Sequence, residues 1–532
     1  MNVLLIQPAI EDFYITKQRT FPTGLIYIAN YLQKFKINVK ILDCVTGIKP
    51  LKIKTDDDFE YLNKYYVKDF SPAKLFHDFF RFGYSNEKFE SILKTKYYDT
   101  DYFCISSNFT PYYKTVIEYC GIIKKNFSGK PVIAGGNNIP VMFELLLKSG
   151  VIDFTVFREG EETLKNLLLS ISSPENVPNI AFIRNNQLII THKSDNFNIN
   201  DNFYKLDFID TEKYKIGKQK CLSLVTSRGC GYSCTFCSSN KNTTGYSKKN
   251  IEIVKNEISY NIKRYGLTAL NIEDENFTSD KFYTFEFCEF IIKNFSDLKL
   301  YFMNGLHYIN LDSNLIKCLN KSGMQTLNIS LVDCGAQNFS RKTDLKLLSE
   351  IIQAAYNLNM LVTVYLIIGL PGQSYDDLIK ALEFLTEQKN VVIGPSIFYP
   401  LPNLDIFKYH KSKIDKIPYS AMRMTAACYE TDFFSKTDLI TFFRLIRTLN
   451  LIKIFNSENN IELPELGNNN IVSNVKLNQS LLFKILYNKI KTEKKLFGIN
   501  DITKKSEKFY YKLFSYEQNF DLSKNFIEKF YY

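Results

Sequence analysis

Short apolar runs alternate with amphipathic segments along the first 170 residues of the chain. Continuous apolar runs of four to eight residues are typical of strands that are buried on both faces of a parallel sheet. Apolar residues that recur every three or four positions are typical of helices. Strands that alternate with helices predict an α/β fold whose N-terminal part is a doubly wound parallel sheet. The predicted strands are residues 2–7, 38–44, 101–106, 131–136 and 153–157, and the charged, aromatic segment 49–96 is assigned to helix.

The carboxyl ends of these strands are candidate ligand contacts. Open α/β sheets bind ligands beyond the carboxyl ends of their strands. The segments that follow the predicted strands are residues 7–8, 106–110, 135–136 and 158–163.

A second alternating series begins after a polar, Asn-rich stretch that we interpret as a surface connector. Each of its first five strands is followed by a helical pattern, which predicts a (β/α)6 partial TIM barrel with its chemistry at the carboxyl ends of the strands. The chain beyond residue 402 has helical patterns, including residues 420–430 and 438–455. The predicted barrel strands are residues 222–227, 269–274, 298–303, 326–331, 361–368 and 391–397. The predicted domains are residues 1–171, 172–217 (the connector), 218–400 and 401–532.

Composition and charge change this picture little. The 532 residues carry 67 Lys and Arg against 56 Asp and Glu, a net charge of +11, with no run of five basic residues. Such a mild excess does not indicate a nucleic-acid partner. The longest apolar stretch, residues 361–371, is far shorter than the ~20 residues of a membrane span. We expect a soluble, cytoplasmic protein because the N-terminal apolar run also lacks a basic flank.

Three of the eleven cysteines form a cluster. Cys230, Cys234 and Cys237 have the spacing CxxxCxxC within TSRGCGYSCTFCSSN, directly after the first barrel strand. Three thiolates on one loop can bind three irons of a [4Fe–4S] cluster and leave the fourth iron open for another ligand. Phe236 is placed to shield such a cluster from water. The other cysteines are expected to be reduced core residues.

A zinc site is the alternative for these cysteines. It would need a fourth ligand such as Cys221, and structural zinc sites use paired Cys or Cys/His sets. The chain has four histidines and none of them lies near the motif. The pattern therefore favours an iron–sulfur cluster.

The cysteine loop and the barrel strands together resemble the radical S-adenosylmethionine (SAM) superfamily. The resemblance implies that the open iron binds the amino and carboxylate groups of SAM. It also implies that an electron, supplied by a donor such as flavodoxin or ferredoxin, cleaves SAM to a 5′-deoxyadenosyl radical.

The same resemblance implies SAM contacts from the loop and from the ends of later strands. Asp274, in IEDENF, is expected to bind the amino group, because it shares a strand face with Ile272 and so points into the barrel mouth. Gln373, in YLIIGLPGQ, stands where glutamate is common in the family. The implied SAM contacts are Phe236, Asp274, Ser330, Asp333, Gly369 and Gly372.

The N-terminal motifs PTGLIYIANYL, SSNFTPYY, VIAGGNN and REGEET resemble the cobalamin-binding domain that precedes many radical SAM cores. The chain lacks an Asp-x-His-x-x-Gly motif, and His77 lies in an aromatic run that predicts packing, so cobalt would have no histidine ligand. Arg158 replaces a glycine that is usual before the EGE triplet. The implied cobalamin contacts are Pro8, Gly24, Ser106, Ser107, Phe109, Thr110, Gly135, Gly136, Glu159, Gly160 and Glu161.

Together these resemblances imply a cobalamin-dependent radical SAM enzyme that methylates an unactivated carbon of a small-molecule or peptide substrate. One alternative is a rearranging or ring-modifying radical SAM enzyme with a relic cobalamin domain. A non-catalytic cobalamin or iron–sulfur sensor is another. An RNA methylthiotransferase would need a second cluster, for which the N-terminal cysteines Cys44, Cys104 and Cys120 have the wrong spacing.

Overall fold

The computed structural model describes residues 1–16, 19–63, 78–194, 197–239, 245–332, 343–388, 390–407 and 411–440, together with 442, 443, 446, 447 and 450. Its contacts divide the chain into two compact units. The first unit comprises residues 1–55, 78–325 and 401–422, and the second comprises residues 56–77, 326–400 and 423–532. His77, Asp333 and the part of the predicted helical C-terminal region beyond residue 450 lie outside the described residues.

A seven-stranded sheet forms the N-terminal part of the first unit. Its strand order is β10-β9-β8-β7-β6-β1-β3. The five strands from β3 to β8 run parallel and lie where the apolar runs predicted them. They are β1 (Asn2–Gln7), β3 (Asn38–Asp43), β6 (Tyr102–Ser106), β7 (Val132–Gly135) and β8 (Phe154–Val156).

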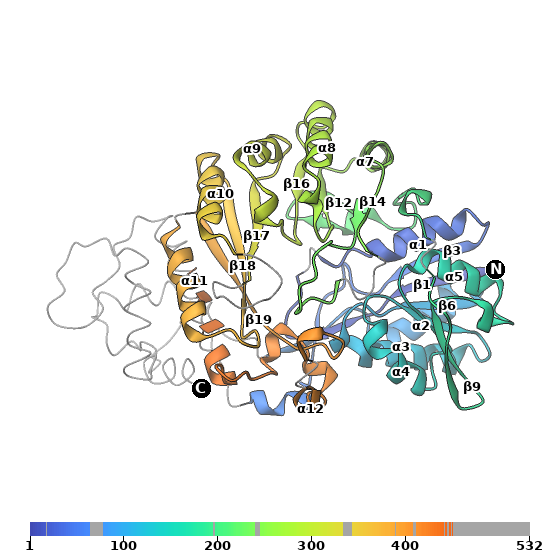
Figure 1. The fold of residues 1–532 in the computed structure, drawn as a ribbon. Helices are drawn as coiled ribbons and strands as arrows, with labels where there is room; N and C mark the ends of the chain where they lie inside the picture. Colours follow the sequence, from blue (N-terminus) through green and yellow to red (C-terminus); the bar gives the residue numbers. More distant parts are fainter. Residues whose placement is uncertain are drawn as a thin grey trace. The chain divides into compact units, whose positions relative to one another are not determined.

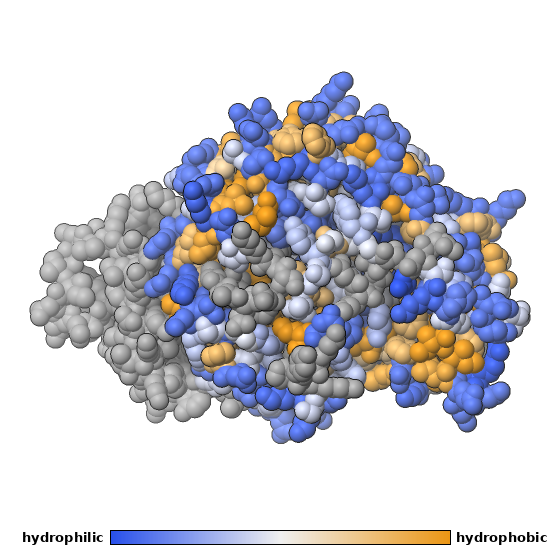
Figure 2. Space-filling view, in the orientation of Figure 1, coloured by the Kyte–Doolittle hydropathy of each residue, from blue (hydrophilic) through white to orange (hydrophobic). Residues whose placement is uncertain are grey.

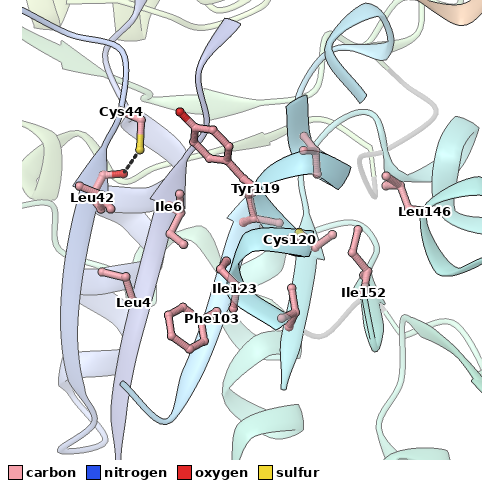
Figure 3. Packing of buried hydrophobic residues seen from close by; sticks show 14 of the residues in the cluster. Leu4, Ile6, Leu42, Cys44, Phe103, Tyr119, Cys120, Ile123, Leu146 and Ile152 are labelled. Carbon is pink, nitrogen blue, oxygen red and sulfur yellow. Dashed lines mark hydrogen bonds between the residues drawn. The ribbon is translucent and has the colours of Figure 1, made fainter. Parts of the chain in front are cut away.

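Helices cover both faces of this sheet (Figure 1). Leu4 and Ile6 of β1 belong to the same buried cluster as residues of α2 (Asn86–Lys96), α3 (Tyr113–Asn126) and α4 (Ile139–Lys148). Val3 and Leu5 point to the opposite face and pack with α1 (Thr23–Gln33) and α5 (Gly160–Leu169). The alternation follows from the two-residue period of a strand. Figure 3 shows side chains of α3, such as Tyr119 and Ile123, packed beside the strands.

Two segments differ from the sequence-based expectation. The stretch interpreted as a surface connector supplies β9 (Ile180–Arg184) and β10 (Gln187–Ile190), which extend the sheet as antiparallel strands. The segment 49–96, assigned to helix, contains β4 (Leu51–Ile53) and β5 (Phe79–Phe82) as well as α2. These two strands join β2 (Ile10–Asp12) in an antiparallel sheet.

The helical assignment of β5 was wrong because a buried ion pair hides its strand character. Arg81 of β5 is buried, and its guanidinium pairs with Glu11 and Glu118. The two partners lie 70 and 37 residues away along the chain, as the numbering shows. The local sequence pattern therefore predicts that Arg81 is exposed. In the folded chain Arg81 can be buried because carboxylates from distant parts of the sequence pair with it.

All six predicted barrel strands are present, three in each unit. In the first unit β12 (Gln219–Leu224), β15 (Ala269–Ile272) and β16 (Lys299–Tyr301) are parallel, with β11 (Lys215–Ile216) antiparallel at the edge. In the second unit β17 (Thr326–Leu331), β18 (Leu361–Ile368) and β19 (Val391–Ile397) form a parallel sheet. The helices that follow the first five strands are α7 (Ile251–Tyr265), α8 (Lys281–Asn294), α9 (Ser313–Lys321), α10 (Leu345–Asn357) and α11 (Tyr375–Glu387).

The helix expected at residues 420–430 is not formed. This stretch holds two 3-10 turns, Tyr419–Ala421 and Met424–Ala426, and Ala427 adopts a left-handed conformation with φ +45°. Apolar residues along this whole segment are buried, and not only those on one face of a helix. Their spacing in the sequence nevertheless resembles a helical pattern, which led to the wrong prediction. The short helix α12 (Lys411–Ile414) precedes it.

None of the helices in the described part of the chain has the length and apolar character needed to cross a membrane. Figure 2 shows one face of the molecule, on which apolar residues form separate patches among polar ones.

Candidate functional site

The cysteine loop begins where β12 ends. β13 (Ser227–Arg228) pairs with β14 (Ser247–Lys248) and closes the base of the loop. Gly229 and Gly231 flank Cys230 with φ angles of +76° and +75°, a region in which glycine avoids the steric cost of a Cβ. Within the loop the Cys237 amide donates a hydrogen bond to the Cys234 carbonyl at 3.2 Å.

The chemistry of this donor set fits an iron–sulfur cluster. Cys230, Cys234 and Cys237 are half-buried thiols on one loop, and Phe236 beside them is also half-buried. Soft thiolate sulfur is the ligand that such clusters take, with one thiolate for each iron. Among the described residues, no three His, Cys, Asp or Glu side chains surround a single point as the ligands of one metal ion would. The three cysteines would thus hold three irons of a cluster.

Asp274 anchors the start of the loop. One of its carboxylate oxygens accepts from the Thr226 amide, and the other accepts from the Thr226 and Ser227 hydroxyls, all at 2.6 Å. The side chain is only 3% exposed, and burial raises its pKa to about 6. Asp274 was expected to face the SAM amino group. Both of its carboxylate oxygens are engaged by the start of the loop that carries the cysteines, and a contact between Asp274 and SAM stays a prediction.

A chain of amides pins the other side of the loop. The Asn276 side chain donates to the Cys230 carbonyl at 3.0 Å and accepts from Asn310 at 3.1 Å. The Tyr232 hydroxyl donates to the Asn310 side-chain oxygen at 3.4 Å. The Tyr232 ring stacks on His307, with ring centroids 4.7 Å apart and planes inclined by 13°. Sequence reasoning missed these residues, although Asn276 lies within the polar stretch singled out after the second barrel strand.

Glu273 points to the opposite strand face from Asp274. One of its carboxylate oxygens accepts from the Ser223 hydroxyl at 3.1 Å and from the Asn271 side chain at 2.9 Å. Burial raises the pKa of Glu273, and the positive charge of Arg19 opposes this shift. Ser223, Asn271 and Glu273 therefore form a polar face at the carboxyl ends of β12 and β15.

The remaining residues implied for SAM lie in the second unit. Ser330 is on the half-buried face of β17. Gly369 and Gly372 adopt φ angles of +82° and +87°, so both positions favour glycine. Whether these three residues contact SAM stays a prediction.

Gln373 explains a departure from the family pattern. Its side-chain oxygen accepts from the Gly369 amide at 2.7 Å, and its NH2 group donates to the Ile367 carbonyl at 3.1 Å. An ionised glutamate could accept the first hydrogen bond but could not donate the second. The amide therefore suits this loop.

The sheet edge at β6 and β7 has a buried polar network. Thr110 donates to the Asn138 side chain at 2.7 Å, and Asn138 donates to the Ser107 hydroxyl at 3.2 Å. Gly136 has φ +123°, and a Cβ there would lie 2.6 Å from both the Ser107 carbonyl and the Asn108 side-chain oxygen. Ser106 and Gly135 end their strands half-buried, whereas Phe109 is 59% exposed. At this edge the Phe109 ring is accessible, and the backbone at Gly136 is tightly packed against Ser107 and Asn108.

The edge at β1 and β3 is filled by the chain itself. The Gln7 side chain donates to the Thr20 carbonyl at 2.8 Å and to Asp43 at 3.0 Å. The Tyr214 hydroxyl donates to the other Asp43 oxygen at 2.7 Å. Pro8 is buried next to this network, and Gly24 lies exposed in the first turn of α1. A ligand contact at Pro8 is therefore less accessible than one at Phe109.

Glu159 and Glu161, implied as cobalamin contacts, bind Arg228 of the cysteine loop. One guanidinium nitrogen contacts Glu159 and also lies 3.2 Å from Glu161, and the other nitrogen contacts the second Glu161 oxygen. Gly160 begins α5, where a Cβ would lie 3.3 Å from the Ile28 side chain. The two carboxylates are thus engaged by this chain's own arginine, and whether they also contact cobalamin stays a prediction.

Arg158 occupies a position that favours glycine. Its φ angle is +56°, in the left-handed region. This conformation costs a residue with a Cβ roughly 1–2 kcal/mol. The glycine that is usual at this point of the motif is therefore explained by backbone geometry.

The N-terminal cysteines are core residues. Cys44 and Cys120 are buried on one face of the sheet, and Cys104 is buried on the other. The Cys44 thiol lies 4.0 Å from the Leu42 carbonyl oxygen. Figure 3 shows this contact, with Cys120 in the same cluster. Since the sheet separates Cys104 from the other two, these three cysteines cannot share a second cluster.

Comparison with known proteins identifies the domain that carries the loop. Residues 224–385, which contain all three loop cysteines, match the family described as the Radical SAM superfamily. An anaerobic magnesium-protoporphyrin IX monomethyl ester cyclase from Synechocystis sp. is 26% identical over 188 residues, which cover 34% of this chain and 38% of the cyclase. The same enzyme from Cereibacter sphaeroides is 22% identical over 305 residues, covering 54% of this chain and 50% of the cyclase. The matches thus span half or less of these two relatives.

A longer match joins the chain to a methyltransferase. The cytidylyl-2-hydroxyethylphosphonate methyltransferase of Streptomyces wedmorensis is 22% identical over 440 residues, covering 73% of this chain and 77% of that protein.

Solved structures share the fold. The radical S-adenosylmethionine methyltransferase TsrM from Kitasatospora setae, with tryptophan and a SAM analogue bound, has a TM-score of 0.60 at 14% identity and covers 76% of this chain and 75% of TsrM. TsrM with cobalamin and a [4Fe–4S] cluster bound has a TM-score of 0.57 at 13% identity, covering 76% and 73%. The CxxxCxxC loop lies directly after β12 and inside residues 224–385, so this part of the chain matches the Radical SAM superfamily together with its three cysteines.

Proposed function

We propose that this chain is a cobalamin-dependent radical SAM enzyme that methylates an unactivated carbon. The observation that carries the proposal is the loop of three cysteine thiols at the end of β12, inside the radical SAM match. When bound, the cluster with SAM supplies a carbon-centred radical oxidant, and cobalamin supplies the methyl group. The chain's own residues hold these groups in place and exclude water.

Each residue of the loop region has a proposed task. Cys230, Cys234 and Cys237 bind the cluster, while Asp274 and Asn276 hold the loop in position through the contacts described above. Glu273 accepts a hydrogen bond from the SAM amino group, since its carboxylate lies on the polar face with Ser223 and Asn271. A carboxylate is the acceptor of choice for an ammonium group because the hydrogen bond is charge-assisted.

Cobalamin is proposed at the carboxyl edge formed by β6 and β7. This edge offers the exposed Phe109 ring, and the close backbone approach at Gly136 keeps it rigid. The fold shared with TsrM supports the placement at fold level. Of the four histidines, the structure describes His192 and His307, and His307 packs against Tyr232 of the cysteine loop. Because the sequence also lacks an Asp-x-His-x-x-Gly motif, we expect cobalt without a histidine ligand.

The substrate is proposed to be a small molecule or a peptide, and the electron donor a reduced flavodoxin or ferredoxin. Ring formation is the second candidate, because several relatives are magnesium-protoporphyrin ester cyclases. The two candidates differ in whether a methyl group from SAM appears in the product.

The test is anaerobic reconstitution with iron, sulfide and hydroxocobalamin. We expect about four irons per chain, which is the cluster stoichiometry. Replacement of Cys230, Cys234 and Cys237 by Ala should abolish the brown chromophore and the cleavage of SAM. Cys318→Ala is the control, because Cys318 is a half-buried thiol outside the loop and should retain the cluster.

Three outcomes would contradict parts of the proposal. A full cluster in the triple variant would refute the ligand assignment. Loss of cobalamin during anaerobic gel filtration would leave a radical SAM enzyme without cobalamin. Histidine hyperfine splitting in the electron paramagnetic resonance (EPR) spectrum of bound cob(II)alamin would refute the histidine-free site.

A further inference from the structure

Arg228 connects the cysteine loop to the large sheet through two carboxylates, a group that we call the Arg228 clamp (Arg228, Glu159 and Glu161). The three side chains are 16%, 16% and 3% exposed. Both guanidinium nitrogens that make the contacts reach Glu161, and one of them also reaches Glu159. All three residues lie in the first unit.

The clamp is held from several sides. The guanidinium carbon lies 5.4 Å from the centre of the Tyr27 ring and 5.1 Å from that of Phe197. The Tyr27 hydroxyl in turn donates to the Val225 carbonyl at 2.8 Å, three residues before Arg228. A planar guanidinium that is stacked on aromatic rings and paired with two carboxylates has little freedom to move.

The opposite charges of Arg228 and its two carboxylate partners stabilise each other in their charged forms. Burial raises the pKa of Glu159, and the positive charge of Arg228 opposes this shift. Burial by itself lowers the pKa of Arg228, but Glu161 and Glu159 outweigh it, and the pKa is raised. Removal of the cation would leave two buried carboxylates side by side, which is far less favourable than an intact pair.

The clamp joins the two proposed cofactor sites. Glu159 and Glu161 lie at the start of α5, directly after β8 of the large sheet. Arg228 is two residues before Cys230, so a shift of its backbone is transmitted to that cysteine over ~7 Å of chain at most. A movement of the carboxyl edge of the sheet would therefore shift Glu159 and Glu161, and through Arg228 it would shift the cysteine loop.

We propose that Arg228 is a positioning residue that fixes the cysteine loop against the carboxyl edge of the sheet, so that ligand binding at that edge and the geometry of the cluster are coupled. The identity of the edge ligand as cobalamin rests on the proposed function. The proposed role of Arg228 in holding the loop does not rest on the proposed function, because all contacts of the clamp are made within the chain.

The experiment compares variants of the reconstituted full chain. Arg228→Gln removes the cation, and the triple variant Arg228→Gln, Glu159→Gln, Glu161→Gln removes all three charges. Arg184→Gln is the control, because Arg184 forms an exposed ion pair with Glu175 on the same sheet. The readouts are iron content, thermal midpoint, SAM affinity, and the EPR spectrum of the reduced cluster with and without SAM.

We expect Arg228→Gln to lower the thermal midpoint, and the triple variant to recover most of it because no uncompensated charge remains. Both variants should retain about four irons. Both should bind SAM roughly tenfold more weakly, and the EPR change caused by SAM should be reduced. Hydroxocobalamin should alter the EPR spectrum of the wild-type cluster and leave that of the triple variant unchanged.

A folded triple variant with wild-type SAM affinity and EPR spectra would overturn the proposal and make the clamp purely structural. A wild-type chain that binds no cobalamin would refute the proposed function instead, since the SAM readouts of the clamp would still be measurable. A cobalamin response of equal size in the wild type and the triple variant would refute the coupling.

Discussion

Glu273 and Asp274 are consecutive acidic residues with different surroundings, because successive side chains at a strand end point to opposite faces. Asp274 accepts three hydrogen bonds from Thr226 and Ser227 and holds the cysteine loop. Glu273 lies on the other face with Ser223 and Asn271. Strand alternation correctly separated the two residues, and which of them contacts SAM stays a prediction.

Replacement of Glu273 tests which acidic residue binds SAM. Glu273→Gln should weaken SAM binding ten- to a hundred-fold, since a charge-assisted hydrogen bond is worth roughly 1.5–3 kcal/mol. The cluster should remain intact, because the side-chain hydrogen bonds described for Glu273 go to Ser223 and Asn271 and not to the cysteines. Calorimetry on the reconstituted chain measures the affinity.

Glu275→Gln is the matched control for Glu273→Gln. Glu275 is an exposed carboxylate two residues further on, and its replacement should change SAM affinity little. Equal affinities for the two variants would remove Glu273 from the proposed site.

At the scale of elements, the sheet has two different carboxyl edges. The edge at β1 and β3 is filled by Gln7, Asp43 and Tyr214. The edge at β6 and β7 has the exposed Phe109 and depends on the tight approach at Gly136. The resemblance treated both edges alike, whereas side-chain packing makes Phe109 at the second edge more accessible than Pro8 at the first.

Gly136→Ala should disturb the accessible edge. The φ angle of +123° disfavours a Cβ, at a cost of roughly 1–3 kcal/mol from backbone strain alone. The added Cβ would also meet the Ser107 carbonyl at 2.6 Å. We expect a lower thermal midpoint and weaker retention of cobalamin after anaerobic gel filtration.

Gly24→Ala is the control at another glycine implied for cobalamin. A Cβ there would meet no atom within 4 Å, and alanine favours the helix by about 0.5–1 kcal/mol. Gly24→Ala should therefore leave the thermal midpoint unchanged or raise it. If Gly136→Ala also left the thermal midpoint unchanged or raised it, the close approach of Gly136 to Ser107 would not contribute to stability.

At the scale of the whole molecule, a buried ion pair ties the elements of the first unit together. Lys249 and Glu257 are fully buried, with the ammonium nitrogen 2.5 Å from one Glu257 oxygen. That oxygen also accepts from the Tyr204 amide at 2.7 Å, and the Lys249 amide donates to the Thr226 carbonyl at 2.8 Å. The pair therefore connects α7, the segment before β11 and the base of the cysteine loop.

This ion pair predicts a pH dependence of stability. Burial raises the pKa of Glu257 to about 7, above its value of about 4.3 in an unfolded chain. The folded chain then holds the proton more tightly, so stability falls as pH rises between about 4.5 and 7, by roughly 1–3 kcal/mol. The pKa values of Tyr27 and Tyr204 are raised well above 10 by burial, so these residues do not titrate in that window.

Glu257→Gln should flatten the thermal midpoint between pH 5 and 7 relative to the wild type, as measured by anaerobic calorimetry. Glu252→Gln, on the exposed side of the same helix, should leave the pH dependence as it is in the wild type. A wild-type midpoint that rises steeply with pH across this window would contradict the assignment to Glu257.

Local sequence patterns determined the elements and the chemistry of the loop. Each predicted parallel strand is present, because a continuous or alternating run of apolar residues specifies a strand through neighbouring residues alone. The radical SAM prediction is confirmed, since three cysteines with the required spacing lie on one short loop. Both kinds of feature can be predicted without knowing which distant residues come into contact in the folded chain.

Tertiary structure decided which side chains meet. Glu159 and Glu161 lie 69 and 67 residues from Arg228, and no local pattern distinguishes a carboxylate that binds a ligand from one that binds a distant arginine. The same holds for β5, whose Arg81 is buried because Glu118 lies on another element. Burial of a charge depends on a partner brought in by the fold, so the tasks of Asp274, Glu159 and Glu161 became visible only with the chain folded.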